Sequence, residues 1–541
     1  MIKNLISCFL FTCVGLIHVQ GQQKIPATPL VVKMEAGEQW WGGAVAEAHQ
    51  APFGSFPYAI NLLGDNKGNQ AQPLLISNYG RYIWCTQPFA FSFQHDSLLI
   101  TSFTDFVQQG KIGNTLSEVY RYVSKRYFPA SGKLPDLLLF TQPQWNTWIE
   151  LTYNQNQQDI LQYAHNVISH GFKPGVLMID DTWQENYGVW QFHPGRFPNP
   201  KAMMDQLHQM GFKVMLWVCP FVSADSPPFR LLESKKALLL EGNGDTTQWL
   251  NAKTAPAIIR WWNGASAVLD FTNPAAVKWF KDQLNRLQNT YDVDGFKFDA
   301  GDAYFYPAAS VAYEKVVPNR HTEIFGEIGL AYPLNEFRAM WKMGGQALAE
   351  RIADKNHNWD DLQKLIPQVV AQGLEGYAFT CPDMIGGGDF VSFLNLTSLD
   401  QDLIVRSAQC HAMMPMMQFS VAPWRVLDAV HLSAVKKAVA LREQQTALIV
   451  QLAKEAAITG EPIIRHLEYV FPKQGYANIK DQFMLGNTMM VAPLLEKNKF
   501  IRDVILPPGK WKADDGKIIK GPVKISIQVP LDRLPYFQKV E

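Results

Sequence analysis

From about residue 131 onward, short apolar runs alternate with helical segments, and this alternation constrains the fold more than any other feature. The apolar runs are 137–140, 176–179, 213–218, 267–271, 295–298 and 376–380, and we expect helices near 155–170, 201–210, 274–290, 401–411 and 432–453. Repeated strand–helix units indicate a parallel sheet, and seven or eight of them fit a closed (β/α)8 barrel. One strand, the sixth, is poorly marked and falls somewhere between residues 335 and 352.

The segments on either side of this region have a different pattern. Residues 22–130 contain short alternating runs, such as 80–84 and 89–93, that predict an N-terminal β-sandwich domain. After the barrel (131–456), residues 457–541 return to short strands and predict a C-terminal β-sandwich domain. The 541 residues therefore predict an α/β protein in which two β domains flank a (β/α)8 TIM barrel.

The first residues resemble a targeting signal. Lys3 is followed by an apolar run over residues 5–19 and by small residues, and we expect cleavage after Gly21. An uncleaved anchor is the weaker alternative, because a membrane span needs about 20 apolar residues. Residues 1–21 thus predict a signal peptide and a secreted or periplasmic protein, with no stable membrane span.

Composition excludes several classes of function. Lys plus Arg and Asp plus Glu both number 49, and without a basic excess or stripe we expect no nucleic-acid partner. The 16 tryptophans of this neutral chain suggest a neutral ligand with a flat face. The cysteines after the signal peptide are widely spaced, and the 12 histidines form no HxH or HExxH motif. We therefore expect buried free thiols, no metal and no cofactor, while the oligomeric state stays open.

Acidic residues follow several of the predicted strands. Asp180 and Asp181 end one strand, Asp299 another and Asp383 a third. Barrel enzymes place their chemistry at these carboxyl ends. Because a helix N-cap also favours Asp, a single one of them can be structural, and we assign that role to Asp270.

Asp299 has the strongest functional case. Side chains alternate along a strand, so Lys297 and Asp299 should share the inner face of the barrel while Phe296 and Phe298 face outward. A nearby cation keeps a carboxylate ionised, which suits a nucleophile. The alternative is a buried structural ion pair. Glycoside hydrolysis would need a second carboxyl as general acid, and spacing alone cannot choose between Asp354 and Asp383.

Several longer motifs resemble one known family. The stretches 177–181, 192–199, 211–217, 270–274 and 294–299 resemble glycoside hydrolase family 31, the retaining α-glycosidases. The stretches 260–264, 414–425 and 481–493 are most similar to its myogenesis-regulating glycosidase branch, whose members look like α-galactosidases. The resemblance covers the chain from about residue 140 to the end.

The resemblance implies roles for individual residues. Asp299 matches the nucleophile of the family, and Asp354 lies sixteen residues after Arg338 and five before Trp359, as the acid/base of the family does. Asp383 then becomes a pocket or structural residue. The remaining expected contacts to the sugar are Trp148, Asp180, Asp181, Trp217, Lys297, Arg338 and Arg351. Trp148 and Trp217 would pack on the sugar ring, unless they belong to the barrel core.

The chain departs from the α-glucosidases of the family at three positions. Lys297 and Arg351 stand where tryptophans are common, and Ser420 stands where a histidine is common. The axial O4 of galactose needs a polar partner that Lys297 could supply. We therefore expect a secreted exo-α-galactosidase acting on an oligosaccharide or α-glycoside. The alternatives are an α-glucosidase or related α-glycosidase, a non-catalytic carbohydrate-binding protein, and a Schiff-base lyase that uses Lys297.

Overall fold

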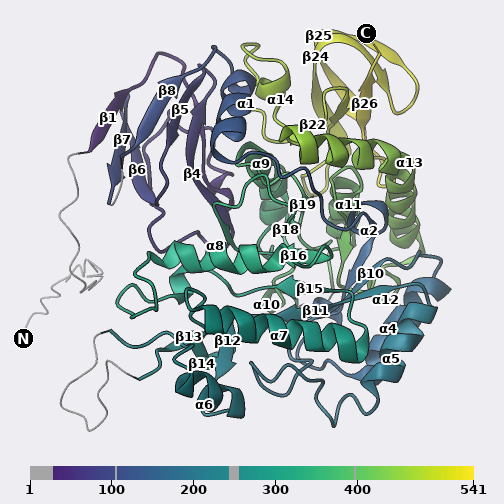
Figure 1. Cartoon of the computed structure of the whole chain (residues 1–541). Helices are drawn as coiled ribbons and strands as arrows, with labels where there is room; N and C mark the ends of the chain where they lie inside the picture. Colours follow the sequence, from purple (N-terminus) through teal and green to yellow (C-terminus); the bar gives the residue numbers. More distant parts are fainter. Residues whose placement is uncertain (1–28, 104–105, 243–254, 395, 397, 541) are drawn as a thin grey trace, which may run out of the picture.

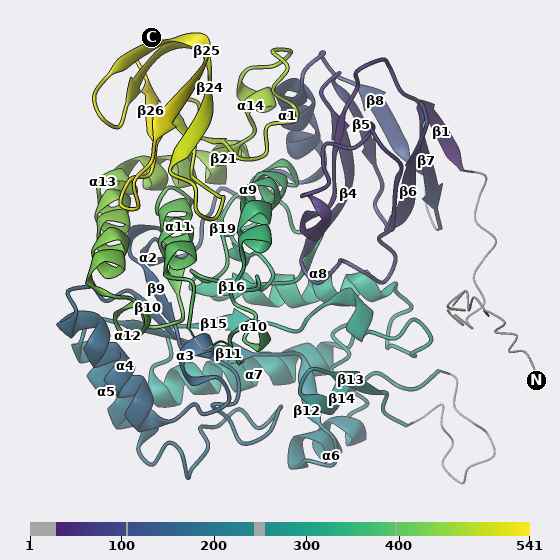
Figure 2. The ribbon, with the colours of Figure 1, turned by 180° about the vertical axis from the view of Figure 1, so that it is seen from behind.

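The protein has a central barrel with a β domain on each of two sides (Figures 1 and 2). The computed structural model describes residues 29–103, 106–242, 255–394, 396 and 398–540. The predicted signal peptide lies outside these residues. In Figure 1 the N-terminal sheets lie at the upper left, the C-terminal strands lie at the upper right, and the barrel occupies the centre and bottom.

An eight-stranded parallel sheet forms the barrel, as predicted. Its strands are, in chain order, β9 (Gln144–Asn146), β10 (Val176–Ile179), β11 (Lys213–Val218), β15 (Gly295–Phe298), β16 (Asn335–Phe337), β18 (Glu350–Arg351), β19 (Thr380–Cys381) and β20 (Gln418–Phe419). Every neighbouring pair is parallel. A parallel bridge between Met384 and Gln418 closes the ring, supported by a 2.8 Å hydrogen bond from the Ile385 N–H to the Gln418 carbonyl.

Most of the helices that cover the barrel begin where the sequence supplies a side-chain cap. They are α4 (Gln157–Ser169), α5 (Pro200–Gln209), α7 (Pro274–Tyr291), α8 (Pro318–Gly329), α9 (Trp359–Leu374), α11 (Gln401–Ala412) and α13 (Ala429–Thr459). Asn156, Asn199, Asn273, Asn358 and Asp400 each accept a first-turn N–H of the helix that follows. Such caps satisfy N–H groups that have no partner inside the helix. The five helices predicted from the alternation are all present.

Two predicted barrel strands are wrong. Residues 137–140 lie largely in a short helix, α2 (Leu138–Thr141), because the Asp136 carboxylate accepts the Leu138 N–H and starts a helical turn. Residues 267–271 contribute to β14 (Gly264–Val268), which pairs antiparallel with β12 (Phe221–Ser223) and β13 (Ile258–Trp261) outside the barrel. The poorly marked interval 335–352 holds two barrel strands, β16 and β18, which are too short to show a periodic pattern.

Two antiparallel sheets form the N-terminal domain. One contains β1 (Leu30–Lys33), β7 (Ser97–Ser102), β6 (Phe89–Gln94) and β3 (Tyr58–Asn61), and the other contains β2 (Trp40–Ala44), β4 (Gln70–Ser77), β5 (Arg81–Trp84) and β8 (Gln108–Lys111). A strand from the barrel region, β17 (Met340–Trp341), pairs with β4. Helix α1 (Leu116–Tyr127) follows β8 and was not expected. The Gln70 amide donates to the Arg338 carbonyl at 2.6 Å, so this domain also contacts the residue that directly follows barrel strand β16.

The C-terminal domain is a single six-stranded sheet. Its strands are β21 (Ile464–Arg465), β22 (Phe483–Leu485), β23 (Met489–Val491), β26 (Tyr536–Lys539), β24 (Ile501–Ala513) and β25 (Ile518–Gln528). The buried Arg406 of α11 donates to three carbonyls of this domain, those of Val529, Pro530 and Arg533. Short α14 (Leu467–Val470) lies between the first two strands of the sheet.

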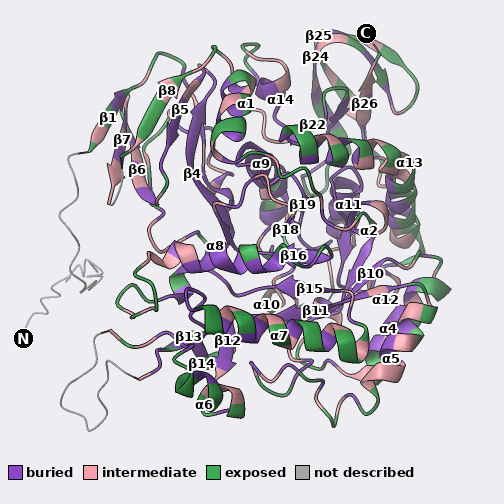
Figure 3. Ribbon diagram, in the orientation of Figure 1, coloured by how far each residue is buried: buried purple, intermediate pink, exposed green. Residues whose placement is uncertain are grey.

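Burial follows these layers (Figure 3), with the barrel strands purple and the outer faces of helices such as α13 green. The four cysteines within the described residues, Cys85, Cys219, Cys381 and Cys410, are buried free thiols, as predicted. No group of three or more His, Cys, Asp and Glu side chains in that part of the chain is arranged to hold a metal ion. Among the described residues, no helix combines the length and apolarity needed to cross a membrane.

Candidate active site

A cavity of about 350 Å³ opens at the carboxyl ends of the barrel strands. Eight of the ten residues predicted for the site line it: Trp148, Asp180, Asp181, Trp217, Lys297, Asp299, Arg338 and Asp354. Arg351 and Asp383, which the sequence led us to expect at the sugar, are buried and are not among the lining residues. The structure therefore brings these eight side chains together in one cavity, while their roles stay predictions.

Asp299 follows β15 and is held by donors on both carboxylate oxygens. Its Oδ1 accepts from Arg338 Nε at 2.8 Å and from the Ala300 N–H at 2.8 Å, and its Oδ2 accepts from Trp217 Nε1 at 3.2 Å. Burial alone would raise the pKa of this carboxyl, but the positive charges of Arg338, Lys297 and Arg351 outweigh burial and hold the pKa well below its usual range. Asp299 is therefore ionised across the physiological range.

Arg338 is fixed by a second carboxylate that the sequence analysis missed. Asp302 is fully buried, and its two oxygens accept from Arg338 NH1 at 2.9 Å and NH2 at 2.5 Å. The NH1 group also donates to the Gly68 carbonyl at 2.6 Å, so the N-terminal domain reaches the site. A guanidinium bound in this two-pronged way has one allowed orientation, which directs Nε at Asp299.

Lys297 shares the inner face with Asp299, as predicted, but its direct partner is Asp180. Lys297 Nζ donates to Asp180 Oδ2 at 2.6 Å, and both side chains are almost fully buried. Burial lowers the pKa of Lys297, yet the Asp180 charge reverses the effect and raises the pKa above its ordinary value. Lys297 is therefore a charged hydrogen-bond donor and lacks the neutral amine that a Schiff base requires.

Asp181 lies beside this pair in a different environment. Its carboxylate accepts from the Tyr187 hydroxyl at 3.1 Å and from the Asn263 amide at 2.5 Å. Burial, followed by repulsion from Asp180, raises the pKa of Asp181 to about 8. Asp181 can thus keep a proton at neutral pH and act as a hydrogen-bond donor, whereas Asp180 neutralises Lys297.

Asp354 and Asp383 meet at one guanidinium nitrogen. Arg351 NH1 donates to Asp354 Oδ1 at 2.5 Å and to Asp383 Oδ1 at 2.9 Å. The Asp354 side chain is 39% exposed and lines the cavity, whereas the Asp383 side chain is 1% exposed and lies behind it. Arg351 NH2 also lies 3.8 Å from Asp299 Oδ2. One buried cation therefore links the two carboxylates that face the cavity.

Two models of known protein families match the domains that form this site and follow it. Residues 140–446 match the glycosyl hydrolases family 31 TIM-barrel domain, and residues 460–541 match the glycosyl hydrolase family 31 C-terminal domain. The chain belongs to glycoside hydrolase family 31. The expected resemblance is therefore confirmed by the barrel and by the domain that follows it.

Individual relatives place the chain within family 31. The myogenesis-regulating glycosidase of Mus musculus is 35% identical over 442 residues, which are 79% of this chain and 60% of the mouse protein. Alpha-glucosidase 2 of Bacillus thermoamyloliquefaciens is 25% identical over 461 residues, which are 77% of this chain and 54% of the enzyme. The chain thus spans little more than half the length of these relatives.

A solved structure confirms the fold over nearly the whole chain. The family 31 dextranase of Flavobacterium johnsoniae, complexed with glucose, superposes with a TM-score of 0.83 at 19% identity. The match covers 94% of this chain and 66% of the dextranase chain.

Aromatic side chains form the wall and rim of this family 31 cavity. Trp217 is buried and donates to Asp299, so it belongs to the floor and positions the carboxylate. Trp148 is less buried, and its indole N–H donates to the Gly388 carbonyl at 3.0 Å. Tyr153 and Phe390 pack edge-on against Trp148 at 5.5 and 5.3 Å. Trp262, which is 46% exposed, lies over the Arg338 guanidinium at 5.5 Å.

Sequence analysis missed the lining residues Lys67, Gly68, Tyr153, Trp262, Ala353, Asp389 and Phe390. Most of them come from loops without a periodic pattern, although Trp262 lies inside the quoted motif 260–264. It also missed Glu336, a buried residue of β16 whose carboxylate lies 3.4 Å from Arg351 Nε. Ser420, which stands where the family commonly has histidine, accepts the Ile149 N–H at 2.7 Å and does not line the cavity.

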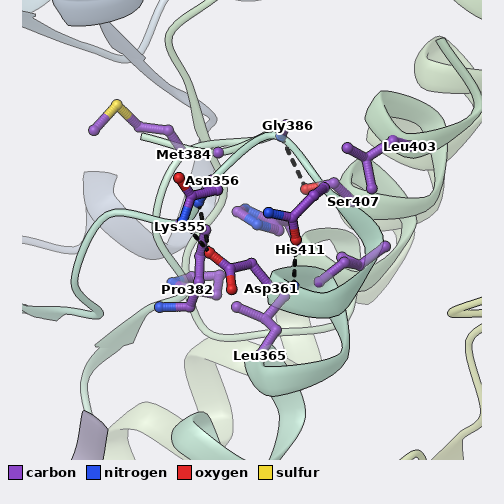
Figure 4. A pocket seen from close by; sticks show the side chains of 13 residues that line it. Lys355, Asn356, Asp361, Leu365, Pro382, Met384, Gly386, Leu403, Ser407 and His411 are labelled. Atoms are coloured by element: carbon purple, nitrogen blue, oxygen red, sulfur yellow. Dashed lines mark hydrogen bonds between the residues drawn. The ribbon is translucent and has the colours of Figure 1, made fainter. Parts of the chain in front are cut away.

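A second, smaller cavity of about 20 Å³ lies behind the loop that carries Asp354 (Figure 4). A space of this size holds about one water molecule. The Asp361 carboxylate at the start of α9 accepts from the N–H and the side-chain amide of Asn356, and Ser407 accepts the Gly386 N–H. These bonds fix the segment that follows Asp354 and the segment that follows Asp383.

Proposed function

We propose that the chain is a retaining exo-α-galactosidase that removes terminal, non-reducing α-galactosyl residues. One observation carries the proposal. Two carboxylates that line the same cavity form ion pairs with the same guanidinium, that of Arg351: Asp299 is buried and ionised, and Asp354 is partly exposed. Retaining glycosidases need this division between a nucleophile and an acid/base.

In the first step, Asp299 attacks the anomeric carbon while Asp354 protonates the departing glycosidic oxygen. The C–O bond to the aglycone breaks, and a β-linked galactosyl ester forms on Asp299. Arg338 and Trp217 hold the carboxylate by both oxygens, so the attack requires little reorientation. The position of Asp354 on the exposed side of the cavity suits an oxygen that must leave with the aglycone.

In the second step, Asp354 is a carboxylate and takes a proton from an incoming water molecule. The water oxygen bonds to the anomeric carbon, the ester bond breaks, and Asp299 is released as a carboxylate. Two inversions return the sugar in the α configuration. Asp354 regains its proton in this step, so the cycle needs no other proton source.

The preference for galactose rests on the Lys297–Asp180 pair. An ammonium and a carboxylate, both buried at the cavity wall, present hydrogen-bonding groups where family 31 α-glucosidases commonly have an indole. An axial hydroxyl that points at this pair replaces water lost on binding, whereas an equatorial hydroxyl leaves the pair unsatisfied, which is costly in a dry site. An α-glucosidase is the second candidate, supported by the 25% identical alpha-glucosidase 2.

The test is turnover of nitrophenyl α-galactoside, α-glucoside and α-xyloside by residues 22–541. We expect galactoside turnover to dominate, with the α-anomer appearing first by NMR. Asp299→Ala should be inactive, and azide should partly rescue Asp354→Ala by attacking the β-linked galactosyl ester in place of water and giving the α-galactosyl azide. Dominant glucoside turnover would support the second candidate, and sugar binding without turnover would support a non-catalytic carbohydrate-binding protein.

We also propose that the protein is exported with cleavage after Gly21, as its N-terminal pattern suggests. Expression of the full chain should yield a product whose N-terminal sequence begins at Gln22, found in the periplasm or the medium. A product that keeps Met1 and stays inside the cell would contradict export.

A further inference from the structure

We propose that the leaving portion of the substrate carries an alkyl chain, and that this chain binds in a groove beside the catalytic cavity. The inference rests on the proposed function and adds the chemical class of the aglycone. The groove has a volume of about 500 Å³, and eight of its twelve lining side chains are apolar. We call it the apolar groove, and its apolar lining includes Ile149, Phe390, Phe393, Leu394, Leu396 and Val421.

Phe390 lines both the catalytic cavity and the apolar groove. Its ring packs edge-on against Trp148 at 5.3 Å and against Tyr153 at 5.6 Å, and both of these aromatic residues line the cavity. Ile149 follows Trp148 in the short helix α3 (Trp148–Leu151) and lines the groove instead, because successive side chains of a helix point about 100° apart. The two spaces therefore meet at the Phe390 ring.

The proposed acid/base lies on the side of the cavity that leads to the groove. A Cβ added to Gly388 would lie 2.9 Å from Asp354 Oδ1, so the backbone of residue 388 runs directly past this carboxylate. Asp389 and Phe390 come next in the chain, and both line the cavity. Because the glycosidic oxygen must lie within hydrogen-bond reach of its acid, the leaving portion extends along this segment toward Phe390.

The polar side chains of the groove are poorly suited to a sugar. The Arg425 guanidinium donates to both carboxylate oxygens of Glu150, at 2.7 and 2.9 Å, so its charge is already balanced. The side-chain oxygen of Gln401 accepts the Asp428 N–H at 2.7 Å. A saccharide in the groove would place hydroxyls against apolar side chains, which is unfavourable, whereas an uncharged alkyl chain gains free energy by leaving water.

The groove has a packed floor and an exposed side. Ile149 and Val421 are buried at the floor, and Phe393 packs against them. On the other side, Leu394 is 61% exposed and Leu396 is 44% exposed. Neighbouring exposed apolar side chains beside a cleft are typical of a ligand-binding site. An alkyl chain lying in the groove would remove both leucines from water.

The experiment compares kcat/KM for methyl, butyl and octyl α-galactosides at concentrations below micelle formation. The three leaving alcohols differ little in acidity, so a difference in rate reports contacts of the chain. Full burial of one methylene gives about a fourfold gain, and half of that free energy over roughly five methylenes beyond Phe390 predicts about thirtyfold for octyl over methyl. Butyl, which is too short to pass Phe390, should stay within about threefold of methyl. Equal values for methyl and octyl would overturn the inference.

A double variant, Leu394→Gln with Leu396→Gln, removes apolar side chains of the groove. Both residues are exposed and neither lines the catalytic cavity, so kcat/KM for methyl α-galactoside should be unchanged. The octyl advantage should fall from about thirtyfold to about fivefold. An undiminished advantage would overturn the groove as the site of the chain.

Val391→Gln is the matched control. Val391 is 58% exposed and belongs to the same short helix as Leu394, α10 (Val391–Leu394), but it does not line the groove. The variant should keep the octyl advantage of the wild type. An equal loss in Val391→Gln and in the double variant would show a general effect of polarity on this segment and would count against the inference.

Other occupants of the groove predict different results. A saccharide would make an α-galactosyl trisaccharide a better substrate than the disaccharide, with that gain lost in the double variant and no octyl advantage. A membrane surface would give binding to phosphatidylcholine vesicles that the double variant loses, again with no octyl advantage. Either result would overturn the inference. A wild-type protein that hydrolyses no α-galactoside would instead refute the proposed function, so the two failures are distinguishable.

Discussion

Arg338 donates through Nε to Asp299 at 2.8 Å, and its other two nitrogens donate to both carboxylate oxygens of Asp302, three residues after Asp299. The second carboxylate balances part of the arginine charge and fixes the plane of the guanidinium. The orientation of Asp299 therefore depends on a residue that never faces the cavity.

Arg338→Lys tests this arrangement. Lysine keeps the charge but cannot bind two carboxylates at once in a planar fork. We expect kcat/KM to fall about a hundredfold. The acidic limb should move to higher pH, because the pKa of Asp299 is depressed in the wild type and rises when the contact is lost. Arg320→Lys, at a half-exposed pair with Glu327, should change neither quantity.

Lys297→Met tests the buried pair at the cavity wall. It leaves the Asp180 carboxylate uncompensated, and we expect a loss of about 3 to 5 kcal/mol in the free energy of unfolding by urea. Adding Asp180→Asn should recover most of that loss. A double variant as unstable as the single one would show that Lys297 acts through packing. Lys278→Met, at an exposed pair with Asp282, should cost less than about 1 kcal/mol.

Trp262→Ala tests the rim. The exposed indole lies over Arg338 and is placed to contact the leaving portion of the substrate. We expect KM for an α-galactosyl disaccharide to rise about fivefold, corresponding to about 1 kcal/mol of lost contact, with kcat nearly unchanged. Trp424→Ala removes an indole stacked on His170, outside the cavity lining, and should leave KM unaffected. A fall in kcat with KM unchanged would contradict this prediction and would indicate that Trp262 stabilises the transition state.

His321→Phe tests acid stability. His321 is buried and stacks on Tyr306 at 4.5 Å, and burial lowers its pKa to about 4. A depressed pKa gives stability that is complete above the unfolded value of about 6.5 and is lost as pH falls, because the unfolded chain takes up the proton first. The wild type should therefore lose about 2 to 3 kcal/mol more than the variant between pH 7 and 4.5. His165→Phe, at an exposed position, is the matched control.

The sequence made some features of the site predictable because they are local. Alternation along a strand is enough to place Lys297 and Asp299 on one face, and the position of a polar residue after an apolar run is enough to place it at a strand end. Strands of two or three residues, such as β16 and β18, carry too few side chains for a periodic pattern, so the sequence analysis could not locate these two strands individually.

Contacts between segments that are far apart in the sequence could not be predicted, because they form only when the barrel folds. Strand alternation could not show that Lys297 pairs with Asp180, 117 residues earlier, or that Gly68 reaches Arg338 from another domain. It also left Asp354 and Asp383 as equal candidates. By itself, then, the sequence determined which residues carry charge at the strand ends, since that follows from spacing along one chain. Only the tertiary structure decided which carboxylate faces the cavity and which lies behind it, because burial and pairing arise when the strands close into a ring.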